Sequence, residues 1–280
     1  FVLGSTGLLG SCVVSYLKHN QPKRKVLALN RNHFDANSRN LPEFITDGIR
    51  PGDAVINCVG VLKPNIQKTG RKQTIMINSH FPQMLADICY RKAAHMIHIC
   101  SDCVFSGEIG QYTETDVCDA TDLYAKTKSI TPDNCTVIRT SFVGDKKSTT
   151  NIGLINWLKS NESGTTVDGY TNCIWNGVTT LELSRIIEEI ICTNDYWTGV
   201  RHLFTTDHIS KYDLCNLINE HYKLNLNIRK TKAESISGSP VPANGRLDRT
   251  LSSIYVPFEV PTIDEQIYNL SKYKYTHASI

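Results

Sequence analysis

Residues 1–11, FVLGSTGLLGS, place Gly4, Gly7 and Gly10 between a short apolar run and a stretch with helical periodicity. Glycine allows a tight turn and a close approach of the backbone to a pyrophosphate, whose negative charge a helix N-terminus favours. The stretch predicts a dinucleotide-binding turn, although an ordinary strand-to-helix turn can also contain three glycines. The residues expected at the cofactor here are Gly4, Ser5, Thr6, Gly7, Leu8, Leu9 and Gly10.

The first half of the chain alternates apolar runs with amphipathic stretches. Apolar runs occupy residues 1–3, 26–29, 54–59, 96–100 and 136–139, and helical stretches cover 8–19, 74–91 and 124–130. Apolar runs without polar alternation are typical of strands buried on both faces of a parallel sheet. The pattern therefore predicts an α/β fold with a doubly wound parallel (Rossmann) sheet.

The second half has fewer strand candidates, and capping residues predict the N-termini of its helices. Residues 179–182, 210–213 and 262–265 each pair a hydroxyl residue with an acidic residue three positions later. This spacing is typical of a helix N-terminus. We expect residues 1–145 to form an NADP-binding domain. Residues 146–280 should form mainly a smaller C-terminal substrate-binding lobe, with some segments returning to the sheet.

Composition narrows the class of protein. The 280 residues carry a net charge of +3, and positive and negative residues are interspersed along the chain. This pattern does not indicate a protein that binds nucleic acid. The apolar runs are too short to cross a membrane, and the sequence shows no secretory leader. We expect the natural start of the protein to precede Phe1. Ten irregularly spaced cysteines indicate reduced thiols in a cytoplasmic protein, so the sequons at Asn134, Asn161 and Asn269 are chance matches. The basic clusters at 23–25 and 146–147 are expected to be solvated.

The end of the second apolar run bears on the cofactor. It reads LNRN, residues 29–32, with Arg31 where an NAD enzyme usually has an acidic residue. A guanidinium suits a 2′-phosphate, so the sequence predicts NADP(H) in preference to NAD(H). Asp35 is a candidate for the adenine amino group, and an ordinary loop aspartate is the alternative.

Tyr124 and Lys128, in DLYAKTK, lie four residues apart on one face of a predicted helix. A nearby ammonium is expected to lower the pKa of the phenol, which could then exchange a proton with a carbonyl oxygen as hydride arrives at its carbon. This spacing alone is weak because surface helices produce it freely. Ser101 strengthens it, since a hydroxyl at the end of the fourth run can polarise the same carbonyl.

Taken together with NCVG (57–60) and Asn78, these motifs resemble those of extended short-chain dehydrogenase/reductases. Within that class the chain resembles the dTDP-4-dehydrorhamnose reductase family. CSDCVFSG (100–107), YTETD (112–116) and DLYAKTK (122–128) carry the resemblance, and IRTSFVG, GVRHLFTTDHISKYDL and VPTIDEQIYNL extend it. It implies reduction of the 4-keto group of a nucleotide-linked 4-keto-6-deoxysugar by NADPH, and a homodimer is common in the superfamily. It gives Ser101, Tyr124 and Lys128 catalytic roles, and places Cys58, Val59, Gly60, Asn78, Tyr124 and Lys128 at the cofactor.

The resemblance also leaves alternatives. Cys103 stands where these reductases usually have tyrosine, and where GDP-fucose synthase and plant-type bifunctional rhamnose synthases have a cysteine implicated in epimerisation. A 3,5-epimerase/4-reductase would use Cys103 with Lys159 as the second acid/base; otherwise Cys103 is packing and Lys159 solvated. Asp102 is followed by Cys103 instead of a second acid, which counts against a dehydratase.

A third reading is an NADP-binding regulatory subunit without turnover, because the β subunit of methionine adenosyltransferase resembles these reductases. Substrate contacts are expected from Ser101, Asp102 and Cys103. Trp175 and Arg246 are further candidates, with a core tryptophan and an exposed arginine as the alternatives. Cys100 and Cys103 do not form a metal site, because no second ligand pair at metal spacing lies near them.

Overall fold

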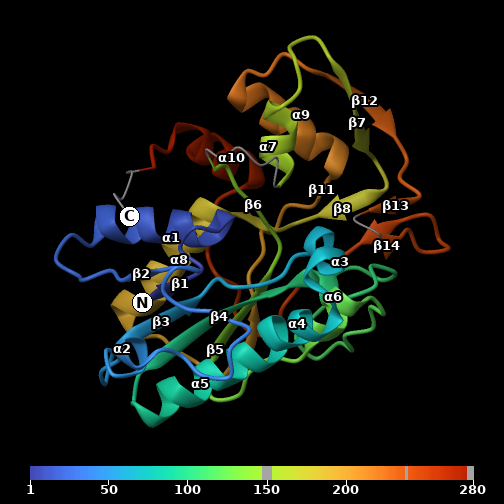
Figure 1. Ribbon diagram of the computed structural model, residues 1–280. Helices are drawn as coiled ribbons and strands as arrows, with labels where there is room; N and C mark the ends of the chain where they lie inside the picture. Colours follow the sequence, from blue (N-terminus) through green and yellow to red (C-terminus); the bar gives the residue numbers. More distant parts are fainter. Residues whose placement is uncertain (147–152, 237–238, 276–280) are drawn as a thin grey trace.

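A computed structural model describes residues 1–146, 153–236 and 239–275 (Figure 1). Its centre is a six-stranded parallel sheet in the order β2-β1-β3-β4-β5-β10. The strands are β1 (Val2–Leu3), β2 (Ala28–Leu29), β3 (Ala54–Asn57), β4 (His95–Ser101), β5 (Thr136–Thr140) and β10 (Gly199–His202). The doubly wound α/β fold is confirmed, and five of its strands lie within or near the five apolar runs. The sixth, β10, was not predicted.

Helices cover both faces of the sheet (Figure 1). On one face α1 (Leu8–Asn20) packs against α8 (Thr180–Thr193), and Val13, Leu17 and Ile187 of these helices are buried with Ile97 of the sheet. On the other face α5 (Phe81–Arg91) buries Phe81 and Leu85. This apolar packing, rather than helix propensity, holds the layers together.

The helix predicted over residues 74–91 begins earlier and is composite. It consists of α4 (Arg71–Ile75), a π-helical turn η2 (Met76–His80) and α5. Short segments that precede or follow it are α2 (Glu43–Thr46), η1 (Lys63–Asn65), α3 (Ile66–Thr69), η3 (Asp102–Val104) and α6 (Leu123–Ser129). π turns inside helices are frequent at functional sites.

A smaller lobe sits above the carboxyl ends of the strands (Figure 1). Its core includes Leu158, Leu214, Ile218 and Ile267. Its helices are α7 (Leu154–Lys159), α9 (Lys211–Tyr222) and α10 (Ile263–Lys272), and its strand pairs are β7 (Thr166–Tyr170) with β12 (Asn227–Thr231) and β13 (Ser235–Ile236) with β14 (Ser239–Pro240). A three-stranded sheet joins β11 (Ile209–Ser210), β8 (Cys173–Trp175) and β15 (Leu247–Asp248), and β6 (Phe142–Val143) pairs with β9 (Val178–Thr179).

The three capping predictions are confirmed. The side chains of Thr179, Ser210 and Thr262 accept from the backbone N–H groups of Glu182, Asp213 and Glu265, and the last pair completes a capping box. α8 and β10 follow residue 145 yet belong to the sheet layers. The division into residues 1–145 and 146–280 stays a prediction.

The strand order places a topological switch point at β1. The chain runs from β1 to β2 on one side and then returns to β3 on the other. Ligands of open α/β sheets bind beyond the carboxyl ends of the strands at such a point. In the part of the chain that the structure describes, no helix is long and apolar enough to cross a membrane.

Candidate active site

The glycine turn lies at this switch point, and close packing explains two of its glycines. Gly4 has a φ of +79°, and a Cβ there would lie 3.0 Å from the carbonyl carbon of Cys58. A Cβ on Gly10 would lie 2.2 Å from the Gly4 carbonyl oxygen. Side chains at these positions would push the turn away from β3 and from α1, so the sequence motif corresponds to a real backbone constraint.

A cavity of about 810 Å³ opens beside this turn. It brings together eight of the residues predicted at the cofactor: Gly4, Thr6, Gly7, Arg31, Asp35, Cys58, Val59 and Gly60. Ser5, Leu8, Leu9 and Gly10 belong to the same turn or to the start of α1 but do not line the cavity. Sequence reasoning missed Asn30, Phe34, Ala36, Asn37, Val61, Thr69, Gln73 and Ile77, which also line it.

Asn78 lies behind the cavity wall, on the π-helical turn η2, and is fully buried. Its Oδ1 accepts from the Val61 N–H at 2.7 Å, and its Nδ2 donates to the Val61 carbonyl at 3.1 Å. The same Nδ2 donates to the Thr127 hydroxyl at 3.2 Å. Asn78 therefore ties the loop after β3 to α6, the helix that carries Tyr124 and Lys128.

Ser101, Tyr124 and Lys128 do not line this cavity, but Lys128 lies directly behind its wall and Ser101 interacts with Tyr124. Tyr124 and Lys128 are both buried on α6, and the Lys128 ammonium donates to the Ile99 carbonyl at 3.3 Å. A Cβ on Gly60 would lie 3.4 Å from Lys128 Nζ, so the ammonium borders the cavity wall. A hydrogen-bond interaction with Ser101 at the end of β4 tends to lower the pKa of Tyr124.

Burial nevertheless outweighs this interaction, and the pKa of Tyr124 is raised well above its usual range. The neighbouring Cys103 raises the pKa of Tyr124 further, and burial lowers the pKa of Lys128. The expectation that Lys128 lowers the pKa of Tyr124 is therefore wrong for this structure, because desolvation is the larger effect. The phenol is protonated at neutral pH.

Cys103 lies on η3, directly after Ser101, whose hydroxyl accepts from the Cys103 N–H at 3.1 Å and donates to Asp102 Oδ1 at 3.2 Å. Burial, helped by Asp102, raises the pKa of the Cys103 thiol to about 11. A thiol with this pKa is a poor base at neutral pH. Lys159 lies elsewhere: its ammonium pairs with Asp145 at 2.9 Å and lies 5.3 Å from the centre of the Tyr222 ring.

Among the described residues, Trp175 and Arg246 form no hydrogen bond or ion pair with Ser101, Tyr124 or Lys128. Trp175 is buried in the lobe core, and its indole N–H donates to the Ser141 hydroxyl at 3.0 Å. Arg246 is exposed, with a guanidinium nitrogen 2.6 Å from Asp248 Oδ2. Their contacts with substrate stay predictions.

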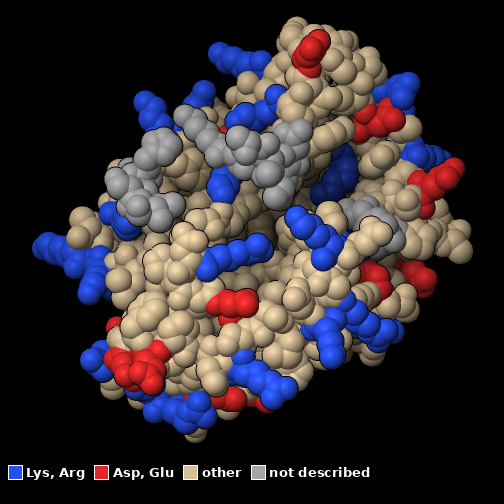
Figure 2. All heavy atoms as spheres, in the orientation of Figure 1, with Lys and Arg blue, Asp and Glu red and all other residues tan. Residues whose placement is uncertain are grey.

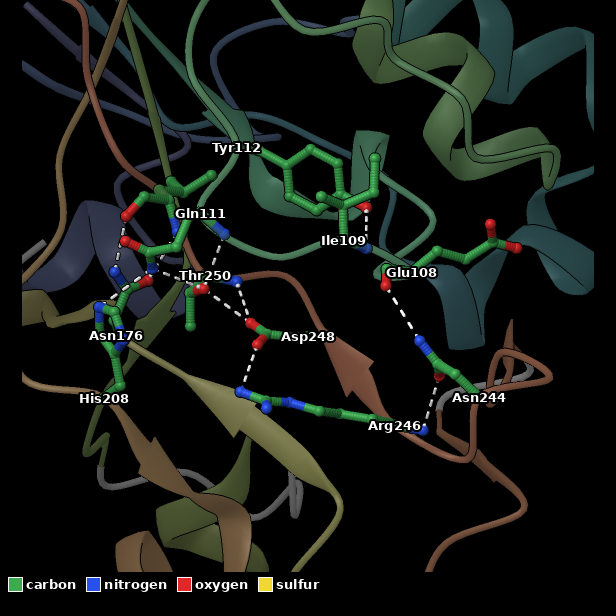
Figure 3. Close-up of polar contacts among 11 residues, drawn as sticks. Glu108, Ile109, Gln111, Tyr112, Asn176, His208, Asn244, Arg246, Asp248 and Thr250 are labelled. Carbon is green, nitrogen blue, oxygen red and sulfur yellow. Dashed lines mark hydrogen bonds and ion pairs between the residues drawn. The ribbon is translucent and has the colours of Figure 1, made fainter.

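Asp248 is the centre of a polar network that fixes the loop after Cys103 (Figure 3). Its carboxylate accepts from the backbone N–H and the hydroxyl of Thr250 as well as from Arg246. The Tyr112 hydroxyl accepts from the backbone N–H groups of Gly107 and Ile109, and the Asp248 N–H donates to the Gly107 carbonyl. The loop that follows Ser101 and η3 is thus held against β15.

The remaining side chains singled out in the sequence are also placed. Lys23, Arg24 and Lys25 are exposed, as predicted. The ammonium of Lys146 donates to the Thr6 carbonyl of the glycine turn, so it is not simply solvated, and Lys147 lies outside the described residues. Among the residues with described positions no three metal-ligating side chains cluster, and Cys100 is buried with its thiol directed to the Lys128 carbonyl.

Comparison with known proteins agrees with this geometry. A family model described as RmlD substrate binding domain matches residues 1–270. A dTDP-4-keto-6-deoxy-D-glucose reductase of Streptomyces niveus is 26% identical over 152 residues, 51% of either chain. A dTDP-4-dehydrorhamnose reductase of Mycobacterium tuberculosis is 31% identical over 132 residues, 45% of this chain and 42% of that protein. The matches thus span about half the length of these two relatives, or less.

A solved structure extends the likeness to almost the whole fold. The dTDP-4-dehydrorhamnose reductase of Bacillus anthracis, determined in complex with NADP, superposes with a TM-score of 0.78. The superposition covers 96% of this chain and 95% of that one, at 17% sequence identity. At this identity the likeness shows a common fold.

Proposed function

Because the chain belongs to the RmlD substrate binding domain family, we propose that it is an NADPH-dependent reductase of a nucleotide-linked 4-keto-6-deoxysugar. The observation that supports the proposal is that Lys128 lies behind the cavity wall at Gly60, on the same helix as the protonated Tyr124, which interacts with Ser101. The names of the relatives, which are reductases of dTDP-linked keto sugars, support the substrate class.

The cavity residues fit a nicotinamide dinucleotide. Gly4 and Gly7 leave the backbone of the turn open to a pyrophosphate, and Arg31 and Asp35 line the far part of the cavity. A nicotinamide supplies a hydride when bound. Lys128 borders the wall at Gly60 and would hold the ribose nearest to the reacting carbon.

Tyr124 and Ser101 would act on the substrate carbonyl. The buried phenol of Tyr124 keeps its proton at neutral pH and can give it to the oxygen that gains charge during reduction. The Ser101 hydroxyl can donate a second hydrogen bond to the same oxygen. When the phenol becomes a phenolate, the neighbouring Lys128 ammonium would stabilise it, an effect that the resting site does not need.

Preference for NADP(H) is part of the proposal. Arg31 is exposed at the cavity edge and offers a guanidinium to a 2′-phosphate, and no carboxylate pairs with it in the described part of the chain.

A homodimer and a cytoplasmic location are proposed from the sequence alone. Light scattering and cell fractionation test them.

The epimerase alternative loses support from the geometry. Lys159 pairs with Asp145 and shares no contact with Cys103 among the described residues, and the pKa of the Cys103 thiol is raised to about 11. A base and an acid on opposite faces of a sugar ring therefore do not come from this pair.

The test is turnover. Each of a panel of 4-keto-6-deoxysugars linked to dTDP, UDP or GDP is added to the protein with NADPH or NADH, and products are identified by NMR. We expect NADPH oxidation with at least one sugar and slower oxidation of NADH. Binding of NADPH without turnover of any sugar would contradict the proposal and favour the regulatory subunit.

A further inference from the structure

Lys211 is a basic side chain that the proposed chemistry does not use. It is the first residue of α9, directly after β11, which pairs with β8 so that Ile209 lies opposite Trp175. Its ammonium lies 4.9 Å from the centre of the Trp175 ring. It forms no ion pair with any residue that the structure describes, although burial is sufficient to lower its pKa.

Lys211 faces the catalytic end of the cleft. The titratable groups that interact with it include Asp102 and Cys103 of η3, together with Cys173 of β8 and Cys215 of its own helix. Asp102 and Cys103 directly follow the catalytic Ser101. Figure 2 shows this face hollowed between the lobe and the sheet layers, with basic side chains at the rim and one set back within the hollow.

Arg249 approaches the same place from another element. It follows β15, and its charge acts on Cys103 and on Cys173, the two thiols that also interact with Lys211. Its Nε donates to the Phe105 carbonyl at 2.8 Å, which orients the guanidinium. No carboxylate pairs with it in the described residues, and most of its five N–H donors stay available.

Neighbouring basic residues are neutralised in contrast. Lys63, which also acts on Cys103, lies 2.8 Å from Asp122, and Arg246 lies 2.6 Å from Asp248. Asp102 acts on Lys211 and Asp122 acts on Arg249, but among the described residues neither carboxylate forms an ion pair with Lys211 or Arg249. Both side chains are half-buried, and a partly desolvated charge is stabilised by a partner of opposite sign. Two cations without an ion pair among the described residues therefore favour an anion at this wall.

We infer that Lys211 and Arg249 together bind an oxyanion of the substrate on the lobe side of the cleft. The inference rests on the proposed function for the identity of that substrate, and it assigns the anion to these two residues instead of Arg246. The diphosphate of the nucleotide has the required chemistry. A 6-deoxysugar carries no carboxylate, so a site for a sugar carboxylate would contradict the proposed substrate.

Isothermal titration with inorganic pyrophosphate, UDP-glucose and UDP-glucuronate tests the inference, with NADP⁺ present to saturate the cofactor site. Lys211→Met keeps most of the aliphatic stem against Trp175 and removes the charge. We expect it to raise the Kd about tenfold, equivalent to ~1.4 kcal/mol. Lys230→Met is the matched control, because this exposed ammonium lies 5.1 Å from the Tyr212 ring, in the same lobe. It should leave every Kd unchanged, and Arg249→Met should resemble Lys211→Met.

The probes separate the two anions. Equal weakening for pyrophosphate and both nucleotide sugars assigns the site to the diphosphate. Weakening confined to UDP-glucuronate assigns it to a sugar carboxylate, which keeps the anion site and contradicts the 6-deoxysugar substrate. The inference is overturned if Lys211→Met binds all three like wild type, or if wild type binds none. Turnover distinguishes this inference from the proposed function. If the Kd depends on Lys211 but no sugar is reduced, the anion site is supported and the reductase activity is excluded.

Discussion

At the scale of the residue, the protonation of Tyr124 decides which step the site can perform. Burial raises the pKa of its phenol, and the interaction with Ser101 does not compensate. A protonated phenol is a proton donor, which is the state that the proposed reduction of a carbonyl requires. Lys128, whose own pKa is lowered by burial, would act mainly after the proton has left.

Replacement of Tyr124 by phenylalanine removes this donor and nothing else from the buried site. We expect Tyr124→Phe to lower kcat by about 10²–10⁴-fold, with little change in the Kd for NADPH, measured by fluorescence titration. Tyr90→Phe is the control, because Tyr90 is an exposed phenol on α5. Full activity in Tyr124→Phe would exclude the assigned role.

Arg31 decides between the two cofactors if its guanidinium meets a 2′-phosphate. Arg31→Ala should raise KM for NADPH about tenfold, an order of magnitude suited to one charge-assisted hydrogen-bonded contact, and leave KM for NADH nearly unchanged. Arg39→Ala is a suitable control, because Arg39 is an exposed arginine in the same segment that does not line the cavity. Equal effects on both cofactors would show that Arg31 does not read the phosphate.

At the scale of the element, the loop from Ser106 to Tyr112 depends on β15 for its shape. Gly110 has a φ of +78°, and a Cβ there would lie 2.6 Å from the carboxyl carbon of Asp248. The loop follows η3, which carries Cys103, so a displaced loop should disturb the catalytic end of β4 as well.

Gly110→Ala tests this link. The substitution adds the strain of a positive φ, about 1–2 kcal/mol, and a clash with Asp248. Gly245→Ala isolates the strain, because Gly245 has a φ of +74° and open space at its Cβ. Urea denaturation should show a larger loss of unfolding free energy for Gly110→Ala than for Gly245→Ala. Equal losses of unfolding free energy would mean that the loop moves away from Asp248 without a measurable cost.

The sequence predicted those elements that local pattern determines. Buried apolar runs marked five of the strands, and hydroxyl and acidic residues marked the N-termini of α8, α9 and α10. β10 was not predicted because its sequence, GVRH, contains a single aliphatic side chain and is only partly buried. The π turn at Asn78 was not predicted because it depends on contacts with Val61 and Thr127, which lie 17 and 49 residues away in sequence.

The site divides in the same way. The glycine turn and the Tyr124–Lys128 pair are local motifs, so they could be predicted. Lys211 and Arg249 come from separate elements of the lobe and meet only through its fold. No spacing in the sequence relates them to Ser101, and the same holds for Thr69 and Gln73 on the cavity wall.

At the scale of the whole molecule, two buried histidines link stability to pH. Burial lowers the pKa of His98, between Asn57 and the sheet core, and of His202, beside Arg139. In the unfolded chain both titrate near pH 6.5. Below that value the unfolded state binds protons that the folded state excludes, so the stability that is present above about pH 6.5 is lost as the pH falls.

Urea denaturation between about pH 7.5 and pH 5, above the range in which most carboxylates titrate, measures this loss. The free energy of unfolding should fall with falling pH, and the slope should be shallower in His202→Gln, which removes one titrating group. A stability that stays constant or rises over this interval would contradict the burial of neutral histidines.

Figure 2 shows the molecule hollowed between the sheet layers and the lobe. Our proposals place the cofactor in the cavity on the sheet side and the substrate anion at Lys211 and Arg249 on the lobe side. The central claim is that hydride passes across this cleft to a sugar carbonyl protonated by Tyr124. NADPH deuterated at the transferring position of the nicotinamide, followed by NMR of the sugar product, tests it most directly. We predict deuterium on carbon 4 of the sugar with wild-type protein, and none with Tyr124→Phe at equal reaction time. Sugar consumed without deuterium at carbon 4, or labelling that persists undiminished in Tyr124→Phe, would contradict the claim.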